Sequence, residues 1–147
     1  ALDDHNVPLT LHYDFDIASF AATDGNMLDI NSNIFAYKLV DQFAKLPAST
    51  RKSPVIIGGD VLSSRTLSLK APEGYTWNAQ TLHDVDIDTP FGKFSRKLTL
   101  DGDKLQLRES IELLSQRIET AQYADFRNFC LAVDEAQRTM IRAQRNE

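Results

Sequence analysis

The sequence predicts a mainly β protein: an antiparallel β-sandwich, with the immunoglobulin-like arrangement as a candidate, and one C-terminal amphipathic α-helix. Three observations predict this class. Apolar and polar residues alternate with a period of two over much of the chain, as on strands with one buried face. Short turn signals such as Asp101-Gly102 separate these stretches, which favours antiparallel pairing. Beyond Thr120 the apolar spacing changes to three and four residues, as on a helix.

The size and composition are those of one globular domain. The chain has 147 residues, of which 42% are hydrophobic and 25% charged, so we predict a single domain over residues 1–147. A net charge of -5 argues against nucleic acid as a partner, because binding phosphates needs clustered lysine and arginine. Since no apolar run approaches the ~20 residues of a membrane helix, we expect no membrane span.

The first half of the chain contains strand patterns separated by turns and one ambiguous stretch. Asp24-Gly25 is a turn signal. Residues 31–43 fit either a helix or a strand, and the two prolines within residues 46–54 predict a loop. The predicted strands in this half are Leu9–Phe20, Met27–Ile30, Val55–Ile57 and Val61–Lys70.

The second half continues the strand pattern and then ends in a helix. Asp101-Gly102 supplies the positive φ of a tight hairpin turn. We expect a helix over about residues 121–141, with Thr120 as N-cap. In this interpretation Arg138, Arg142 and Arg145 oppose the helix dipole near its C-terminal end. The predicted strands are Tyr75–Trp77, Leu82–Asp88 and the two arms of the hairpin, residues 94–100 and 105–113.

The single cysteine and the three histidines do not form a reactive group in the sequence. Cys130 lies on the apolar stripe of the predicted helix, where burial raises a thiol pKa, so we expect a core residue. His5 and His12 lack a second histidine at a ligand spacing, and so does His83, which alternation places beside Val85. We therefore predict no catalytic residue, no metal site and no cofactor.

Three aspartates alternate along one predicted strand. Asp84, Asp86 and Asp88 begin like a calcium loop, but Thr89 stands where such a loop has glycine and Ser95 where it has glutamate. A solvated acidic face is the favoured interpretation. A small hydrolase that uses paired aspartates is the lowest-ranked function.

One aromatic pair is the candidate binding surface. Tyr75 and Trp77 lie on the same side of a short predicted strand that follows a turn. Exposed aromatic rings stack on sugars and on other proteins, although core packing is their more frequent use. The pair supports an alternative function, a carbohydrate- or peptide-binding β-sandwich module.

The order of several short segments resembles a known family. Five of them follow one another as Arg51–Val55, Leu69–Tyr75, Phe91–Phe94, Asp101–Gly102 and Tyr123–Phe129. This order is similar to that of the C-terminal β-rich domain of unknown function in bacterial transglutaminase-like proteins. The resemblance covers about residues 51–141.

The resemblance implies a part of a larger exported protein, located in the periplasm or at the cell surface. In that family the catalytic cysteine, histidine and aspartate belong to a papain-like core, and no segment of this chain matches that core. No catalytic residue carries over, and Cys130 falls in the closing helix instead. The expected function is a non-catalytic accessory domain that packs on or presents the core. Its expected partners are the neighbouring domains of the parent chain, with a peptide or polysaccharide as further candidates.

Overall fold

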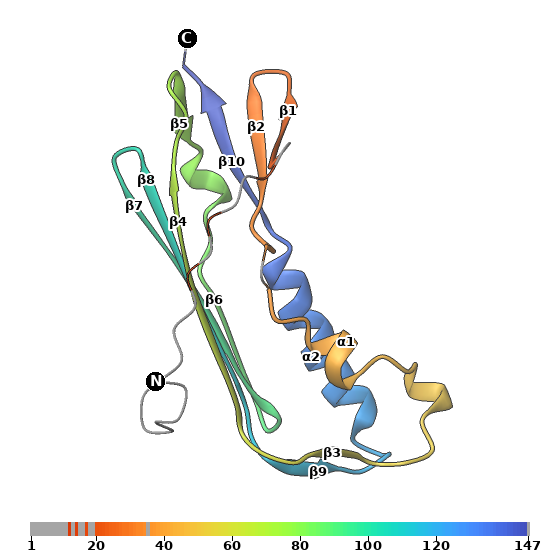
Figure 1. Ribbon diagram of the computed structural model, residues 1–147. Coiled ribbons are helices and arrows are strands. Elements are labelled where there is room, and N and C mark those ends of the chain that lie inside the picture. Colours follow the sequence, from red (N-terminus) through yellow and green to blue (C-terminus); the bar gives the residue numbers. More distant parts are fainter. Residues whose placement is uncertain (1–11, 13, 15–16, 18–19, 35, 147) are drawn as a thin grey trace, which may run out of the picture.

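The computed structural model describes residues 12, 14, 17, 20–34 and 36–146, which form a mainly β fold with antiparallel sheets (Figure 1). A large sheet has the strand order β4 (Val61–Lys70), β8 (Lys104–Leu113), β7 (Gly92–Asp101) and β6 (Val85–Thr89). A second sheet has the order β1 (Ala21–Asp24), β2 (Met27–Asn31), β10 (Met140–Arg145) and β5 (Tyr75–Trp77). The strands β3 (Val55–Ile57) and β9 (Gln116–Ile118) form a small ribbon. The helices are α1 (Leu39–Phe43) and α2 (Tyr123–Gln137), with short 3₁₀ turns at Ala48–Thr50 and Ala79–Thr81.

The large sheet is built on the predicted hairpin. Gly102 has a φ of 59° in the turn that joins β7 to β8, a conformation that glycine adopts without steric cost. On the other side of β8, ten residue pairs join it to β4. The alternation in the sequence thus predicted both the strands and the face that each side chain occupies.

The β4–β8 ribbon bends at one end and continues as β3 and β9, below α2 in Figure 1. At the bend, Ser115 donates its backbone N–H to Asp60 at 2.7 Å and its hydroxyl to the Ile57 carbonyl at 3.2 Å. Gly92 lies beside this region, where a Cβ atom would come 2.2 Å from the Glu112 carbonyl oxygen. Close packing of the backbone therefore requires glycine at this position.

The layer that faces the large sheet is half helix and half sheet. In Figure 1, α2 covers the lower half of the large sheet, and β10 continues upward from its end. The helix packs with Phe94, Ile111 and Leu113 in one hydrophobic cluster, through the side chains Tyr123, Phe126, Phe129, Cys130 and Val133. The helix therefore covers a face of the large sheet.

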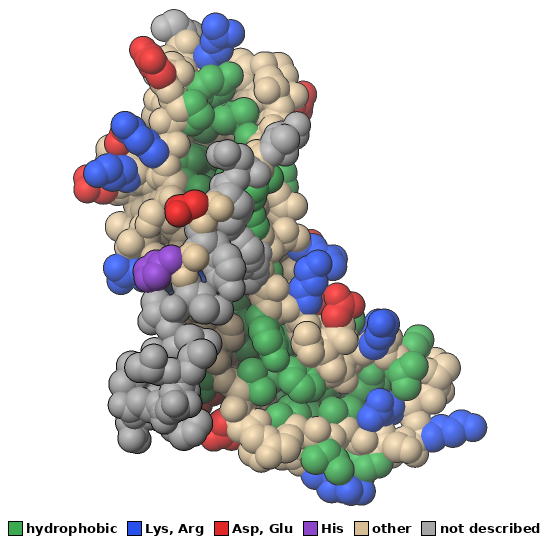
Figure 2. Space-filling view, in the orientation of Figure 1, with side chains coloured by type: hydrophobic (Ala, Val, Ile, Leu, Met, Phe, Trp, Pro, Cys, Tyr) green, Lys and Arg blue, Asp and Glu red, His purple; other side chains and the backbone are tan. Residues whose placement is uncertain are grey.

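The upper half is a sandwich of two sheets, as the sequence predicted. A second hydrophobic cluster joins Leu105 and Leu107 of the large sheet to residues of β2, β5 and β10, namely Ile30, Trp77, Ile141 and Ala143. Figure 2 looks onto the seam between the layers, where hydrophobic side chains extend along much of the molecule. The immunoglobulin-like arrangement remains a prediction.

The predicted C-terminal helix was too long at both ends. The helix begins at Tyr123 with Gln122 as N-cap, so the prediction of Thr120 as the cap was wrong. It ends at Gln137, and Arg142 and Arg145 lie on β10 rather than on the helix. Arg142 pairs with Asp29 of β2, at 2.8 Å between Nε and Oδ1. Only Arg138, the C-cap residue, lies at the helix end as expected.

Two uncertain regions of the sequence have different outcomes. Within the ambiguous residues 31–43, only Leu39–Phe43 forms a helix, and Asn31 ends β2. Of the predicted strand Leu9–Phe20, only positions 12, 14, 17 and 20 belong to the described residues, so that prediction lies outside them. Among the described helices, neither has the length and apolar character needed to cross a membrane.

Candidate functional site

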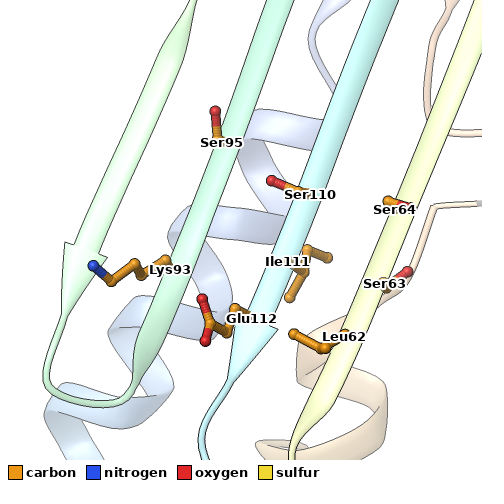
Figure 3. Close-up of a pocket in the computed structure, with 8 residues that line it drawn as sticks. All are labelled: Leu62, Ser63, Ser64, Lys93, Ser95, Ser110, Ile111 and Glu112. Atoms are coloured by element: carbon orange, nitrogen blue, oxygen red, sulfur yellow. The ribbon is translucent and has the colours of Figure 1, made fainter.

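The outer face of the large sheet carries a depression with a floor of serine hydroxyls. Ser110 of β8 lies between Ser64 of β4 and Ser95 of β7, because both are its register partners. Small side chains at one register leave a hollow of about 390 Å³ across the sheet (Figure 3). This hollow was not predicted from the sequence, where the three serines belong to separate segments.

Charged and apolar side chains form the walls of this depression. On the side nearer the bend, the depression is lined by Glu112 of β8 and its register partners, Leu62 of β4 and Lys93 of β7. Its lining supplies no imidazole or thiol that could take a proton from a serine hydroxyl. The hydroxyl and charged groups of this lining suit contact with a polar surface.

A second depression lies on the same sheet near the β7–β8 hairpin. Its volume is about 430 Å³. It is lined by Ser68, Leu69, Lys70, Thr99, Asp101, Lys104, Leu105 and Gln106. The two depressions are separated by Arg108 of β8 and its register partners, Thr66 of β4 and Lys97 of β7.

Directly behind the serine rung, the inner face of the sheet carries a buried charge cluster. Arg65, Glu109 and Arg96 are register partners on β4, β8 and β7. Glu109 accepts a hydrogen bond from Arg65 Nε at 2.6 Å, and its other carboxylate oxygen lies 3.7 Å from Arg96 Nε. Burial lowers the pKa of Arg96, while Glu109 acts in the opposite direction.

This cluster lies where the facing layer changes from helix to strand. Arg96 donates to the carbonyl of Ala136, near the C-terminal end of α2, at 2.5 Å. Arg65 donates to the carbonyl of Ile34 at 2.5 Å. At this junction both arginines donate to backbone carbonyls of the facing layer, and the Ala136 carbonyl also accepts a hydrogen bond from the Thr139 hydroxyl at 3.0 Å. The cluster therefore has a structural role in joining the two layers.

Cys130 is a core residue, as the sequence predicted. It is fully buried on α2, and burial followed by the nearby Asp134 raises the pKa of its thiol to about 12. A thiol with this pKa is protonated at neutral pH. Because the side chain is fully buried, a substrate cannot reach it. Cys130 therefore does not provide a nucleophile.

The three alternating aspartates lie in ion pairs with lysines of β7. Lys97 Nζ lies 2.7 Å from Asp86 and 3.4 Å from Asp84, and Lys93 lies 3.1 Å from Asp88. A hydrogen bond from Lys97 is the main cause that lowers the pKa of Asp86. Among the residues that the structure describes, no group of three or more metal-binding side chains comes together. These aspartates lie on a solvated face, as predicted, but that face is of mixed charge rather than acidic, because lysines of β7 pair with them.

The aromatic pair does not form an exposed stacking surface. Trp77 has only 4% of its surface exposed and belongs to the second hydrophobic cluster, with its indole N–H donated to the Asp103 carbonyl at 2.8 Å. Tyr75 is half-buried beside the same cluster. The burial of Trp77 removes the surface on which the carbohydrate-binding alternative depended.

The histidines lie apart from these features. His12 and His83 are both exposed, whereas alternation had placed His83 on the apolar face beside Val85. Strand β6 begins at Val85, so the alternation of the strand does not extend to His83. His5 lies outside the described residues.

The geometry defines a class of protein: a two-layer β domain in which a helix replaces part of one sheet, with a shallow polar outer face. The chain belongs to the family described as a domain of unknown function with solved structure (DUF3858), whose model matches residues 25–142. The chain has no match among curated proteins.

A crystal structure with a similar fold is that of a protein from Parabacteroides distasonis named a putative protease. The TM-score is 0.57 at 19% sequence identity, and the similarity covers 79% of this chain. It covers 23% of the other chain, so this fold occurs there as one part of a longer protein. At this identity the similarity supports the fold alone.

Proposed function

We propose that this chain is a non-catalytic accessory domain of a larger exported bacterial protein, located in the periplasm or at the cell surface. It packs on or presents a transglutaminase-like core and makes protein–protein contacts. The observation that carries this proposal is the occurrence of the same fold as 23% of a longer chain. The neighbouring domains of the parent chain are its first partners.

The use of the candidate reactive groups supports a role without catalysis. The Cys130 thiol fills the core, and the aspartates of β6 and its flank are ion-paired with lysines. Glu109 holds two arginines inside the fold. Cys130 and Glu109 are thus engaged inside the fold, while the ion-paired aspartates and lysines stay on the solvated outer sheet face, which we propose for recognition.

Removing residues 1–147 from the parent protein tests the proposal. The parent without this domain should show a lower melting temperature of its catalytic core, while isolated residues 1–147 should turn over no peptide or isopeptide substrate. An unchanged melting temperature and unchanged kinetic constants would contradict the accessory role. A coding sequence around this chain without papain-like cysteine and histidine segments would contradict the proposed core.

A further inference from the structure

Among the residues that the structure describes, strand β4 is a long edge strand that pairs with another strand on one side only. Its ten residues pair with β8 on one side. Within the described part of the chain, no other strand and no further backbone hydrogen bond meets it. An edge strand of this kind presents a row of free N–H and C=O groups, which can pair with another strand.

The two edges of the large sheet differ in length and charge. The opposite edge, β6, has five residues, and Asp86 and Asp88 make its outer face acidic. Short length and charge are the usual features that prevent pairing between sheet edges. The outer side chains of β4 are uncharged until its last residue, in the order Leu62, Ser64, Thr66, Ser68 and Lys70. The protection present at β6 is therefore missing at β4.

We propose that β4 pairs antiparallel with β4 of a second copy of this chain, around a two-fold axis at Thr66. In this register Ser64 lies opposite the partner's Ser68, and Leu62 lies opposite the partner's Lys70. No two like charges on the outer face come into contact. On the inner face Arg65 already contacts Glu109, at 2.6 Å from Nε to Oε2. The strand is thus complementary to itself, which favours a second copy as the occupant.

Pairing in this register also extends the outer face. Ser64 lines the first depression and Ser68 lines the second, so each depression of one copy would adjoin the other depression of the partner. The two large sheets would form one continuous sheet of eight strands. The resulting polar trough would belong to the dimer and not to either chain alone.

A pair of double variants tests both the dimer and its register. The expected mass of the wild-type chain in sedimentation equilibrium is twice the 16.6 kDa of one copy, across a dilution series. S64K/S68K places two lysines opposite each other at both symmetry-related positions, whereas S64E/S68K places glutamate opposite lysine. We expect S64K/S68K to associate about tenfold more weakly than S64E/S68K.

Circular dichroism and thermal melting show that each variant folds, and T99K on β7 serves as a control because Thr99 lies two strands from the edge. T99K should dimerise like the wild type. A wild-type chain that stays monomeric throughout the series would overturn the proposal. Equal association of S64K/S68K and S64E/S68K would overturn the register.

Discussion

Asp134 on α2 accepts a hydrogen bond from the backbone N–H of Leu39, the first residue of α1, at 2.8 Å. Its second oxygen accepts from the N–H of Val40 at 3.2 Å. These N–H groups have no partner within the helix, and Lys38, the N-cap residue, makes no side-chain cap. A carboxylate 95 residues away in sequence therefore caps a helix of five residues.

Replacing Asp134 tests this capping in trans. D134A should lower the free energy of unfolding by about 1–2 kcal/mol, because the first N–H groups of α1 lose their acceptor while buried. Urea unfolding followed by circular dichroism measures the loss. E135A alters the adjacent exposed residue of the same helix and should change stability much less. Equal effects of the two substitutions would show that the cap contributes nothing.

The buried Glu109 should be far more sensitive to substitution than an exposed glutamate on the same strand. E109Q removes the negative charge between Arg65 and Arg96, which leaves the buried Arg96 and the half-buried Arg65 without compensation. We expect a loss of about 3–5 kcal/mol in the free energy of unfolding. E112Q on the outer face should stay within about 0.5 kcal/mol of the wild type. If both variants unfold at the same urea concentration, the cluster does not hold the layers together.

Substitution of Gly92 tests the close backbone approach near the bend, with Gly58 as the control position. A Cβ atom at Gly92 would lie 2.2 Å from the Glu112 carbonyl oxygen, while a Cβ atom at Gly58 would have no atom within 4 Å. G92A should destabilise the fold by about 1–3 kcal/mol because the strands must separate. G58A should be close to neutral in the same thermal melt. A neutral G92A would contradict the close approach.

The native Cys130 thiol should not react with a thiol reagent. Because burial raises its pKa to about 12, almost no thiolate exists at pH 8, and the side chain is shielded from the reagent. Ellman's reagent should label the chain only after unfolding in guanidinium chloride. Rapid labelling of the native chain, with a pH midpoint near the ordinary ~8.5 of a free cysteine, would indicate an accessible and reactive thiol.

Alternation of apolar and polar residues predicted the strands that have one buried and one exposed face. Strands β4, β7 and β8 were predicted in this way, and the Asp101-Gly102 turn predicted the hairpin that joins β7 to β8. The end of the last helix was missed because Arg138, Arg142 and Arg145 continue a helical spacing. Ile141 and Ala143 are nevertheless buried on alternate positions of β10, which is the period of a strand.

The remaining features depend on contacts between distant residues. Helix α1 is capped by Asp134, so residues 31–43 alone could not decide between helix and strand. The sequence indicates the charge cluster in part, since Arg96 and Glu109 fall on faces that are otherwise apolar, whereas the face of Arg65 also carries Ser63. Their shared register appears only when the three strands pair. The serine depression has the same origin, because each of its floor residues comes from a different strand.

Hydrogen exchange measured on this domain alone and within its intact parent protein tests the proposed accessory role most directly. Exposed backbone groups that a neighbouring domain covers should exchange more slowly in the parent, while the amides of α2 should change little. That protection, confined to one surface, is the predicted result. Identical exchange at every described position in the two samples would contradict packing on the core, and with it the proposed function.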